Sequence, residues 1–314
     1  MALEGIVVKS TGSWFRVRTA PGEEIECKLK GKFRMKGIKT TNPVAVGDKV
    51  VFEMQANENI GMIREIGPRH NHIIRKSTNL SKVSHIIAAN IDMAILVVTL
   101  KNPLTSLGFI DRFLVTAEAY HINAAIVFNK VDIYGQKELA RLEELISIYE
   151  AAEYPCFAVS AISGKNIDQV IELIKGKVIL FSGISGVGKS ALVNAIQPGL
   201  KIKTGKISDY HKMGKHTTTY PEMHHLSFGG FVIDTPGIKE FGLVDFRKEE
   251  IAERFPEMRR YMHDCQFNNC THIHEPKCAV KDAVDKGDIP LSRYNSYLRI
   301  YNDDYLEKDE WEWE

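Results

Sequence analysis

The sequence lacks a long hydrophobic run and a cysteine framework. In this chain of 314 residues the longest apolar stretch, Ile86–Leu100, is interrupted by polar residues. It is shorter than the ~20 residues that a membrane helix needs. The N-terminus has no basic segment followed by an apolar run, so we expect neither a signal peptide nor a membrane partner. Five cysteines are an odd number, and three of them lie in Cys265–Cys278. This pattern predicts a reducing compartment and a metal site.

Glycine and proline are too few, at 23 and 11 residues, for a collagen-like or wholly disordered chain. The net charge of +1 hides an uneven distribution: residues 244–314 carry a net charge of −6, while the segments before them are mildly basic. Much of this negative charge lies in the last fourteen residues, which also contain Trp311 and Trp313. An acidic tail of this kind is either a solvated segment or an interaction arm.

Residues 1–70 predict a small β-barrel of the OB type. Short strand patterns occur at residues 5–8, 14–18, 24–29 and 44–54, and no helix-length pattern interrupts them. Basic residues are interleaved with aromatic ones around Trp14 and Phe33. OB barrels use such faces to bind RNA, although a merely solvated basic face is the alternative. Residues 71–90 resemble a polar connector.

From Ile91 onward, strand and helix patterns alternate, which predicts a parallel sheet covered by helices. The expected strands are at 93–99, 124–128, 157–159 and 178–181, and the expected helices at 109–120, 136–151 and 167–174. After Leu243 the pattern is mainly helical, at 248–255, 279–286 and 292–306. We therefore expect an α/β multidomain chain with domains at 1–70, 71–243 and 244–314.

A phosphate-binding loop (P-loop) follows the strand at 178–181 and precedes a helix at 191–196. Its glycines let backbone N–H groups turn toward phosphate oxygens, and the helix presents its N-terminus to the anion. Lys189 is expected to reach the β and γ phosphates, and the Ser190 hydroxyl to bind Mg²⁺. The residues expected to contact the nucleotide here are Ser182, Gly183, Ile184, Ser185, Gly186, Val187, Gly188, Lys189 and Ser190.

A second motif predicts that the base is guanine. Asn129-Lys130-Val131-Asp132 ends the strand at 124–128. The Asp132 carboxylate can accept hydrogen bonds from both the N1–H and the exocyclic amino group of guanine, and adenine offers neither donor there. Ser160-Ala161 matches a second loop on the guanine side. A four-residue run of this kind can be only a turn, but beside a P-loop it predicts GTP or GDP.

Two further motifs predict the parts that respond to the γ-phosphate. Asp234-Thr235-Pro236-Gly237 matches the DxxG motif, in which the Asp holds Mg²⁺ through water and the Gly N–H contacts the γ-phosphate. His216-Thr217-Thr218-Thr219 predicts switch I, where one threonine, such as Thr218, completes the Mg²⁺ shell. The guanine motifs precede the P-loop, the reverse of the Ras-like order. Circular permutation explains this order, because the termini of a domain often lie close together.

The cysteine cluster has the spacing of a zinc site. Cys265-x4-Cys270-x-His272-x5-Cys278 offers three thiolates and one imidazole, which suit a closed, structural Zn²⁺ site. The nearby His263 and His274 are competing ligands. Buried free thiols are the alternative to a metal site.

Together these features resemble the RsgA/YjeQ family of ribosome small-subunit-dependent GTPases. The resemblance covers nearly the whole chain and is closest at Gly183–Ser190, 214–219 and 234–243. It implies a cytoplasmic bacterial assembly factor that binds the 30S subunit and its rRNA late in maturation and leaves on GTP hydrolysis. We also expect a monomer. The sequence leaves two alternative functions: a signalling or transport GTPase with a protein partner, and a zinc-dependent RNA-binding module with a degenerate nucleotide site.

The catalytic group is less evident. Ras-like enzymes place a water-orienting Gln directly after DxxG, and this chain has Ile238 there. We therefore expect a low intrinsic rate, with His216 as the group that orients the water, as the resemblance also suggests. The alternative is that His216 packs or contacts RNA. The stretch Lys201–Lys215, with five lysines, is either a solvated loop or an rRNA contact.

Overall fold

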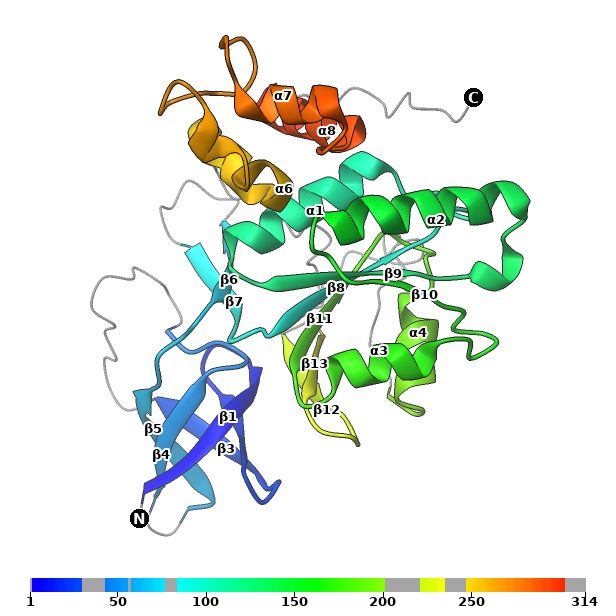
Figure 1. Ribbon diagram of the computed structural model, residues 1–314. Coiled ribbons are helices and arrows are strands. Elements are labelled where there is room, and N and C mark those ends of the chain that lie inside the picture. The colour runs from blue at the N-terminus through cyan, green and yellow to red at the C-terminus, as the bar shows by residue number, and fades with distance from the viewer. Residues whose placement is uncertain are drawn as a thin grey trace, which may run out of the picture. The chain divides into compact units, whose positions relative to one another are not determined.

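The computed structural model describes residues 2–29, 43–55, 58–76, 84–200, 221–234 and 247–302 (Figure 1). The chain divides into two compact units. The first comprises Met1–Ala94, Val170–Phe181 and Ile196–Ile238, and the second comprises Ile95–Gln169, Ser182–Ala195 and Lys239–Glu314. Several predicted features lie outside the described residues: the basic stretch around Phe33, Lys201–Lys215, switch I with His216 and Thr218, Gly237, and the acidic tail.

The N-terminal part of the first unit is a closed, five-stranded barrel, as predicted. Its strands are β1 (Ala2–Ser10), β2 (Phe15–Thr19), β3 (Glu24–Leu29), β4 (Lys49–Met54) and β5 (Ile60–Ile66). They pair in the order β1-β2-β3-β5-β4, and β4 closes back onto β1. The alternation in β2 buries Phe15 and Val17 and directs Arg16 outward, where it pairs with Glu26. Gly61 permits close packing, because a Cβ there would lie 2.5 Å from the Cys27 sulfur.

The first unit also contains strands that the sequence pattern did not indicate. Residues 71–90 are not a polar connector: β6 (His72–Lys76) and β7 (Ser84–Ala89) form an antiparallel pair. Farther along, β12 (Glu222–His225) was not indicated either. It pairs antiparallel with β13 (Phe231–Asp234), which pairs in parallel with β11 (Val178–Ser182), the strand expected at 178–181. Lys9 and Glu222 are register partners and form an ion pair of 2.9 Å, so β12 also adjoins the barrel strand β1.

The second unit contains the expected alternation of parallel strands and helices. Strands β8 (Met93–Val98), β9 (Asn123–Phe128) and β10 (Cys156–Ala158) lie side by side, and every residue of β8 is buried. A strand covered on both faces reads as one continuous apolar run, which is why β8 was evident from the sequence. The helices are α1 (Leu107–Ala119), α2 (Gln136–Ala151), α3 (Ile167–Ile174), which spans the boundary between the units, and α4 (Lys189–Ile196). Figure 1 shows α1 and α2 on the same face of β8 and β9.

The C-terminal residues form short helices packed on α1. They are α5 (Lys248–Ile251), η2 (Ala252–Arg254), α6 (Pro256–Arg259), η3 (Met262–Asp264), α7 (Ala279–Lys286) and α8 (Leu291–Asn302). Their core joins Val115 of α1 to Phe255, Met258 and Tyr297. The single helix expected at 248–255 is instead α5 and a 3₁₀ turn. It ends at Phe255 because Pro256 restricts the preceding residue to extended backbone.

Candidate functional site

The predicted phosphate-binding loop lies between the end of β11 and the start of α4. Gly183, Gly186 and Gly188 all have positive φ, which side chains rarely allow. A Cβ on Gly183 would also lie 2.3 Å from the Val97 carbonyl oxygen. The Lys189 ammonium donates to the carbonyl oxygens of Gly183 and Ile184, at 2.6 and 2.8 Å. The loop therefore closes around its own lysine, whose pKa burial lowers.

Asn129 links three of the predicted nucleotide loops. This side chain is only 1% exposed. Its amide nitrogen donates to the Val187 carbonyl in the P-loop at 2.9 Å, and its amide oxygen accepts from the Ala161 N–H at 3.1 Å. Gly188 leaves room for this contact, because a Cβ there would lie 2.4 Å from the Asn129 amide nitrogen. Segments that are far apart in the chain thus meet around one amide.

The rest of the Asn129-Lys130-Val131-Asp132 motif forms a turn. Lys130 has a left-handed backbone, and its ammonium donates to the Asn102 carbonyl at 2.5 Å. Asp132 follows in a 3₁₀ turn, Val131–Ile133, and is exposed, which leaves its carboxylate accessible to a base. Ser160 is fully buried, and its hydroxyl accepts from the Ser163 N–H. It therefore shapes the loop that presents Ala161.

Tyr134 is a positioning residue that the sequence analysis did not identify. Its hydroxyl accepts from the Leu100 N–H at 2.8 Å and donates to the Asn129 carbonyl at 2.7 Å. Burial raises the pKa of Tyr134 to about 12, so the proton needed for the second bond is retained. The only sequence signal was an aromatic residue shortly after a motif, which is too common to be informative. Tyr134 fixes the ends of β8 and β9 relative to each other.

Of the other residues predicted to bind the nucleotide or Mg²⁺ or to orient the water, three lie in described segments and three do not. Ser190 is exposed in the first turn of α4, and Ser182 ends β11. Asp234 is the last residue of β13, in the first unit, where its register partner is Glu222. Gly237, His216 and Thr218 lie outside the described residues.

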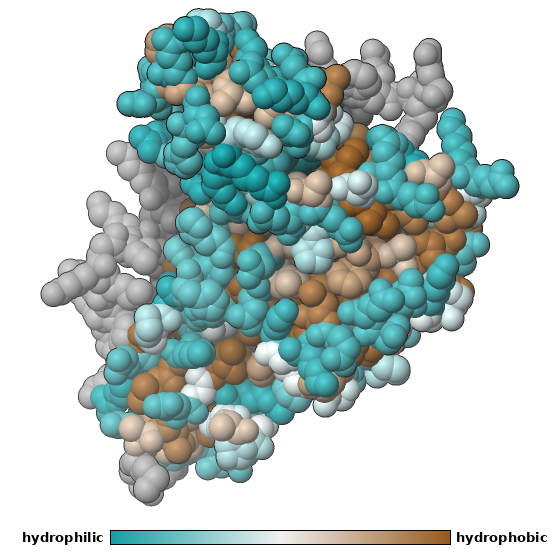
Figure 2. All heavy atoms as spheres, viewed as in Figure 1, coloured by the Kyte–Doolittle hydropathy of each residue, from teal (hydrophilic) through white to brown (hydrophobic). Residues whose placement is uncertain are grey.

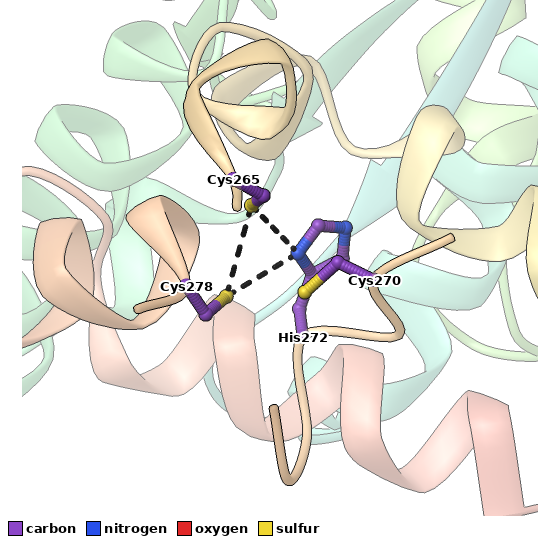
Figure 3. A group of neighbouring side chains, drawn as sticks. All are labelled: Cys265, Cys270, His272 and Cys278. Carbon is purple, nitrogen blue, oxygen red and sulfur yellow. Dashed lines mark hydrogen bonds between the residues drawn. The ribbon is translucent and has the colours of Figure 1, made fainter. Parts of the chain in front are cut away.

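The four predicted metal ligands converge in the C-terminal helices (Figure 3). The sulfur atoms of Cys265, Cys270 and Cys278 and the Nδ1 atom of His272 all lie within 4.8 Å of one another. Cys265 and Cys278 sulfurs are 3.9 Å apart, and His272 Nδ1 lies 3.6 and 3.4 Å from them. Tetrahedral zinc with ordinary bond lengths requires separations of about 3.8 Å between sulfurs and about 3.6 Å from sulfur to nitrogen.

These distances fit zinc and distinguish among the neighbouring histidines. His272 belongs to the cluster, whereas His263 and His274 do not. Burial raises the pKa of the Cys270 thiol to about 12 and lowers that of His272. A divalent cation reverses the effect on the thiols, because it favours thiolates electrostatically.

The loop that carries the ligands is held in place from two sides. The Glu275 carboxylate accepts from the hydroxyl and N–H of Thr271 and from the backbone N–H groups of Ile273 and His274. The Thr271 hydroxyl is the largest cause of a Glu275 pKa of about 2. From α8, the Tyr294 hydroxyl donates to the His272 carbonyl at 2.6 Å. These contacts fix the position of the loop that carries Cys270 and His272.

The fold and the joined loops define the class: a P-loop GTPase whose guanine motifs precede its phosphate motif. The chain belongs to the RsgA GTPase family, whose model matches residues 66–244, and the RsgA N-terminal domain model matches residues 4–63. Family membership makes it a GTP-hydrolysing enzyme.

Individual relatives and solved structures support the same assignment. The chain is 54% identical to the small ribosomal subunit biogenesis GTPase RsgA of Christiangramia forsetii, over 95% of both chains. It is also 54% identical to RsgA 2 of Bacteroides thetaiotaomicron, over 96% of this chain and 97% of that one. The crystal structure of YjeQ from Thermotoga maritima matches with a TM-score of 0.80 and 37% identity, over 96% of this chain and 98% of the other. YloQ, described as a circularly permuted GTPase, matches with a TM-score of 0.77 and 30% identity, over 96% and 95%.

No helix among the described residues is long and apolar enough to cross a membrane.

Proposed function

We propose that this protein is a GTPase that acts in biogenesis of the small ribosomal subunit, the role for which its relatives are named. The observation that carries the proposal is Asn129, whose amide joins the P-loop to the Ala161 loop. These two hydrogen bonds hold the phosphate loop and the guanine loop together, as a GTPase requires. An RNA-binding module with a degenerate nucleotide site would not need them. The substrate is GTP, and the partner is the 30S subunit with its rRNA.

Each nucleotide loop has a distinct role in this proposal. The exposed Asp132 carboxylate accepts from guanine, and the N–H groups of the glycine-rich loop bind the phosphates. Lys189 exchanges its present carbonyl acceptors for phosphate oxygens. Mg²⁺, when bound with the nucleotide, offsets charge on the β and γ phosphates, and Ser190, Thr218 and Asp234 are the residues to hold it.

The chemical step needs a group that orients the attacking water. His216 takes that role in the proposal because the position after DxxG is occupied by Ile238, whose side chain has no hydrogen-bonding atom. We expect His216→Ala to retain GTP affinity and to lower the ribosome-stimulated rate by about 10–1000-fold, the range for one positioned polar group. In the proposal, the backbone N–H of Gly237 donates a hydrogen bond to the γ-phosphate, so this contact is present only before hydrolysis.

We further propose that one structural zinc is bound by Cys265, Cys270, His272 and Cys278. The support is the fit of their spacing to tetrahedral coordination. All four positions are filled by protein ligands, so the metal leaves no site for substrate. Zinc would stiffen the loop that carries these ligands, beside the core of the C-terminal helices.

The proposed organisation is an RNA-binding barrel at 1–70, a permuted GTPase domain at 71–243 and a zinc-binding helical domain at 244–314, in a monomeric cytoplasmic protein. The decisive experiment measures GTP hydrolysis with 30S subunits, with 50S subunits and with neither. Stimulation by 30S alone supports the proposal. Equal rates in all three would instead favour a signalling or transport GTPase with a protein partner. Steep salt dependence of 30S binding would indicate contacts to rRNA phosphates.

A further inference from the structure

An apolar groove of about 760 Å³ lies beside the phosphate-binding loop, within the second unit. It is lined by the loop before α1 and by residues of α1, α2 and α8. Its large apolar side chains are Leu104, Leu107, Phe109, Ile184 and Leu291. Leu291 is 62% exposed and Leu104 is 43% exposed. The two exposed leucines therefore line one groove with three other large apolar side chains, unlike apolar residues scattered singly over a surface.

Figure 2 shows apolar residues beside the C-terminal helices, across the middle of the face drawn and on the barrel. Ile184 places one end of the groove at the phosphate-binding loop, because its carbonyl oxygen accepts from the Lys189 ammonium.

The charged side chains that line the groove are all basic. They are Arg112, Arg141 and Arg299, and the described lining includes no Asp or Glu. Arg141 also pairs with the exposed Glu144 at 2.5 Å, which offsets part of its charge. Guanidinium groups form strong hydrogen bonds with carboxylates and stack on aromatic rings. The groove therefore suits a peptide that combines acidic and aromatic side chains.

The chain contains a peptide of this kind, joined directly to the end of α8. Residues 303–314 hold seven acidic residues, one lysine and the large apolar side chains Tyr305, Leu306, Trp311 and Trp313. The segment is also long enough. From Asn302 back to Leu291 is about 17 Å along the helix axis at 1.5 Å per residue. Nine residues of extended chain, enough to reach Trp311, span roughly 30 Å.

We propose that residues 303–314 bind in this groove as an intramolecular ligand. The tryptophans pack against the apolar lining, and the carboxylates face the three arginines. In this position the tail lies against the phosphate-binding loop at Ile184, and its release exposes the groove. A peptide from another protein and the tail of a second copy are the competing occupants.

The tryptophan content of the chain provides a direct test. Besides Trp14, its only tryptophans are Trp311 and Trp313, so in Trp14→Phe the tryptophan emission, excited selectively over tyrosine, comes from the tail alone. The probe is acrylamide quenching of this full-length variant, compared with a synthetic peptide of residues 303–314. We expect the tail in the protein to be protected and to emit at shorter wavelength than the peptide. High salt should remove much of the protection, because screening weakens exposed ion pairs.

The groove is then altered at an exposed position where folding is not at risk. Leu291→Glu places an acid in the first turn of α8, which a helix tolerates well, and it repels the acidic tail. We expect loss of the protection in this variant. Leu139→Glu is the matched control, because Leu139 is a 42% exposed leucine on α2 outside the groove lining. This control should keep the protection. Arg112→Gln is a second groove variant and should weaken it.

Three results would each overturn the proposal. The first is equal quenching of the parent and the peptide, which means that the tail is not bound. The second is protection that persists in Leu291→Glu, which places the tail elsewhere. The third is protection that increases with protein concentration, which assigns the groove to the tail of a second copy.

Discussion

Replacing the buried Arg293 of α8 with methionine tests how the C-terminal helices are held on α1. The Arg293 Nη1 donates to Asp111 Oδ1 at 2.5 Å, and its Nε donates to Glu257 Oε1 at 2.6 Å. All three side chains are at most 3% exposed. Burial works against the charged form, but the two carboxylates hold the pKa of Arg293 well above its ordinary value. The Phe255 ring lies 4.8 Å from the guanidinium carbon.

Arg293→Met keeps most of the aliphatic stem and leaves two buried carboxylates without their counter-charge. Breaking a buried ion pair from one side costs about 3–5 kcal/mol. For a unit of this size the Tm should fall by roughly 6–20 °C, as measured by differential scanning calorimetry. The control is Arg247→Met: Arg247 is 79% exposed and pairs with Glu250 on the surface, so its loss should leave Tm unchanged.

A third variant distinguishes charge from packing. The described hydrogen bonds to the Glu257 carboxylate come from Arg293, so Glu257→Gln removes one of the stranded charges. Arg293→Met combined with Glu257→Gln should cost less than the sum of the two single changes. Strict additivity would refute the charge argument. So would a Tm for Arg293→Met equal to that of the Arg247→Met control.

Three further predictions concern the site. Asp132→Asn should weaken GTP binding by about 1–3 kcal/mol and improve the binding of xanthine nucleotides, as measured by titration calorimetry. Equal affinity of the parent protein for ATP and GTP would contradict the guanine-binding role of Asp132. Tyr134→Phe removes the acceptor of the buried Leu100 N–H, so it should weaken GDP binding by about 1–3 kcal/mol and speed GDP dissociation. An unchanged dissociation rate in stopped-flow measurements would show that Tyr134 does not position the site. Cys270→Ser should abolish stoichiometric zinc, measured by plasma mass spectrometry, and should lower Tm. Zinc retained at the parent's level would show that another residue completes the site.

Local patterns predicted many of the elements correctly. The helices at 136–151, 167–174 and 279–286 have the predicted bounds, because apolar spacing along a helix is a local property. Strands β6, β7 and β12 were missed. Their polar and basic residues do not alternate cleanly with apolar ones, and their partners are needed to define them. The helical segment expected at 248–255 ends just before Pro256, but its change from α5 to a 3₁₀ turn at Ala252 was not predicted.

The sequence indicated the residues of the candidate site, but it did not indicate most of the contacts that the described ones make. Spacing indicated Asn129 and Gly188, yet the bond from the Asn129 amide to Val187 spans 58 positions, and no local pattern encodes it. The four candidate zinc ligands were easier to select, because they lie close together in the sequence and coordination chemistry limits the choice.

The contacts of Arg293 were even harder to predict from the sequence. In the sequence it is one charged residue on an amphipathic helix, for which solvent exposure is the usual expectation. Its partner Asp111 lies 182 positions away and is equally unremarkable by itself. The packing of α8 on α1 brings the two side chains together and buries them. Because the pair is buried, removing one partner costs much more stability than it would at the surface. Motifs constrained by chemistry can therefore be read from one sequence. Buried charges become evident only when the tertiary contacts that neutralise them are known.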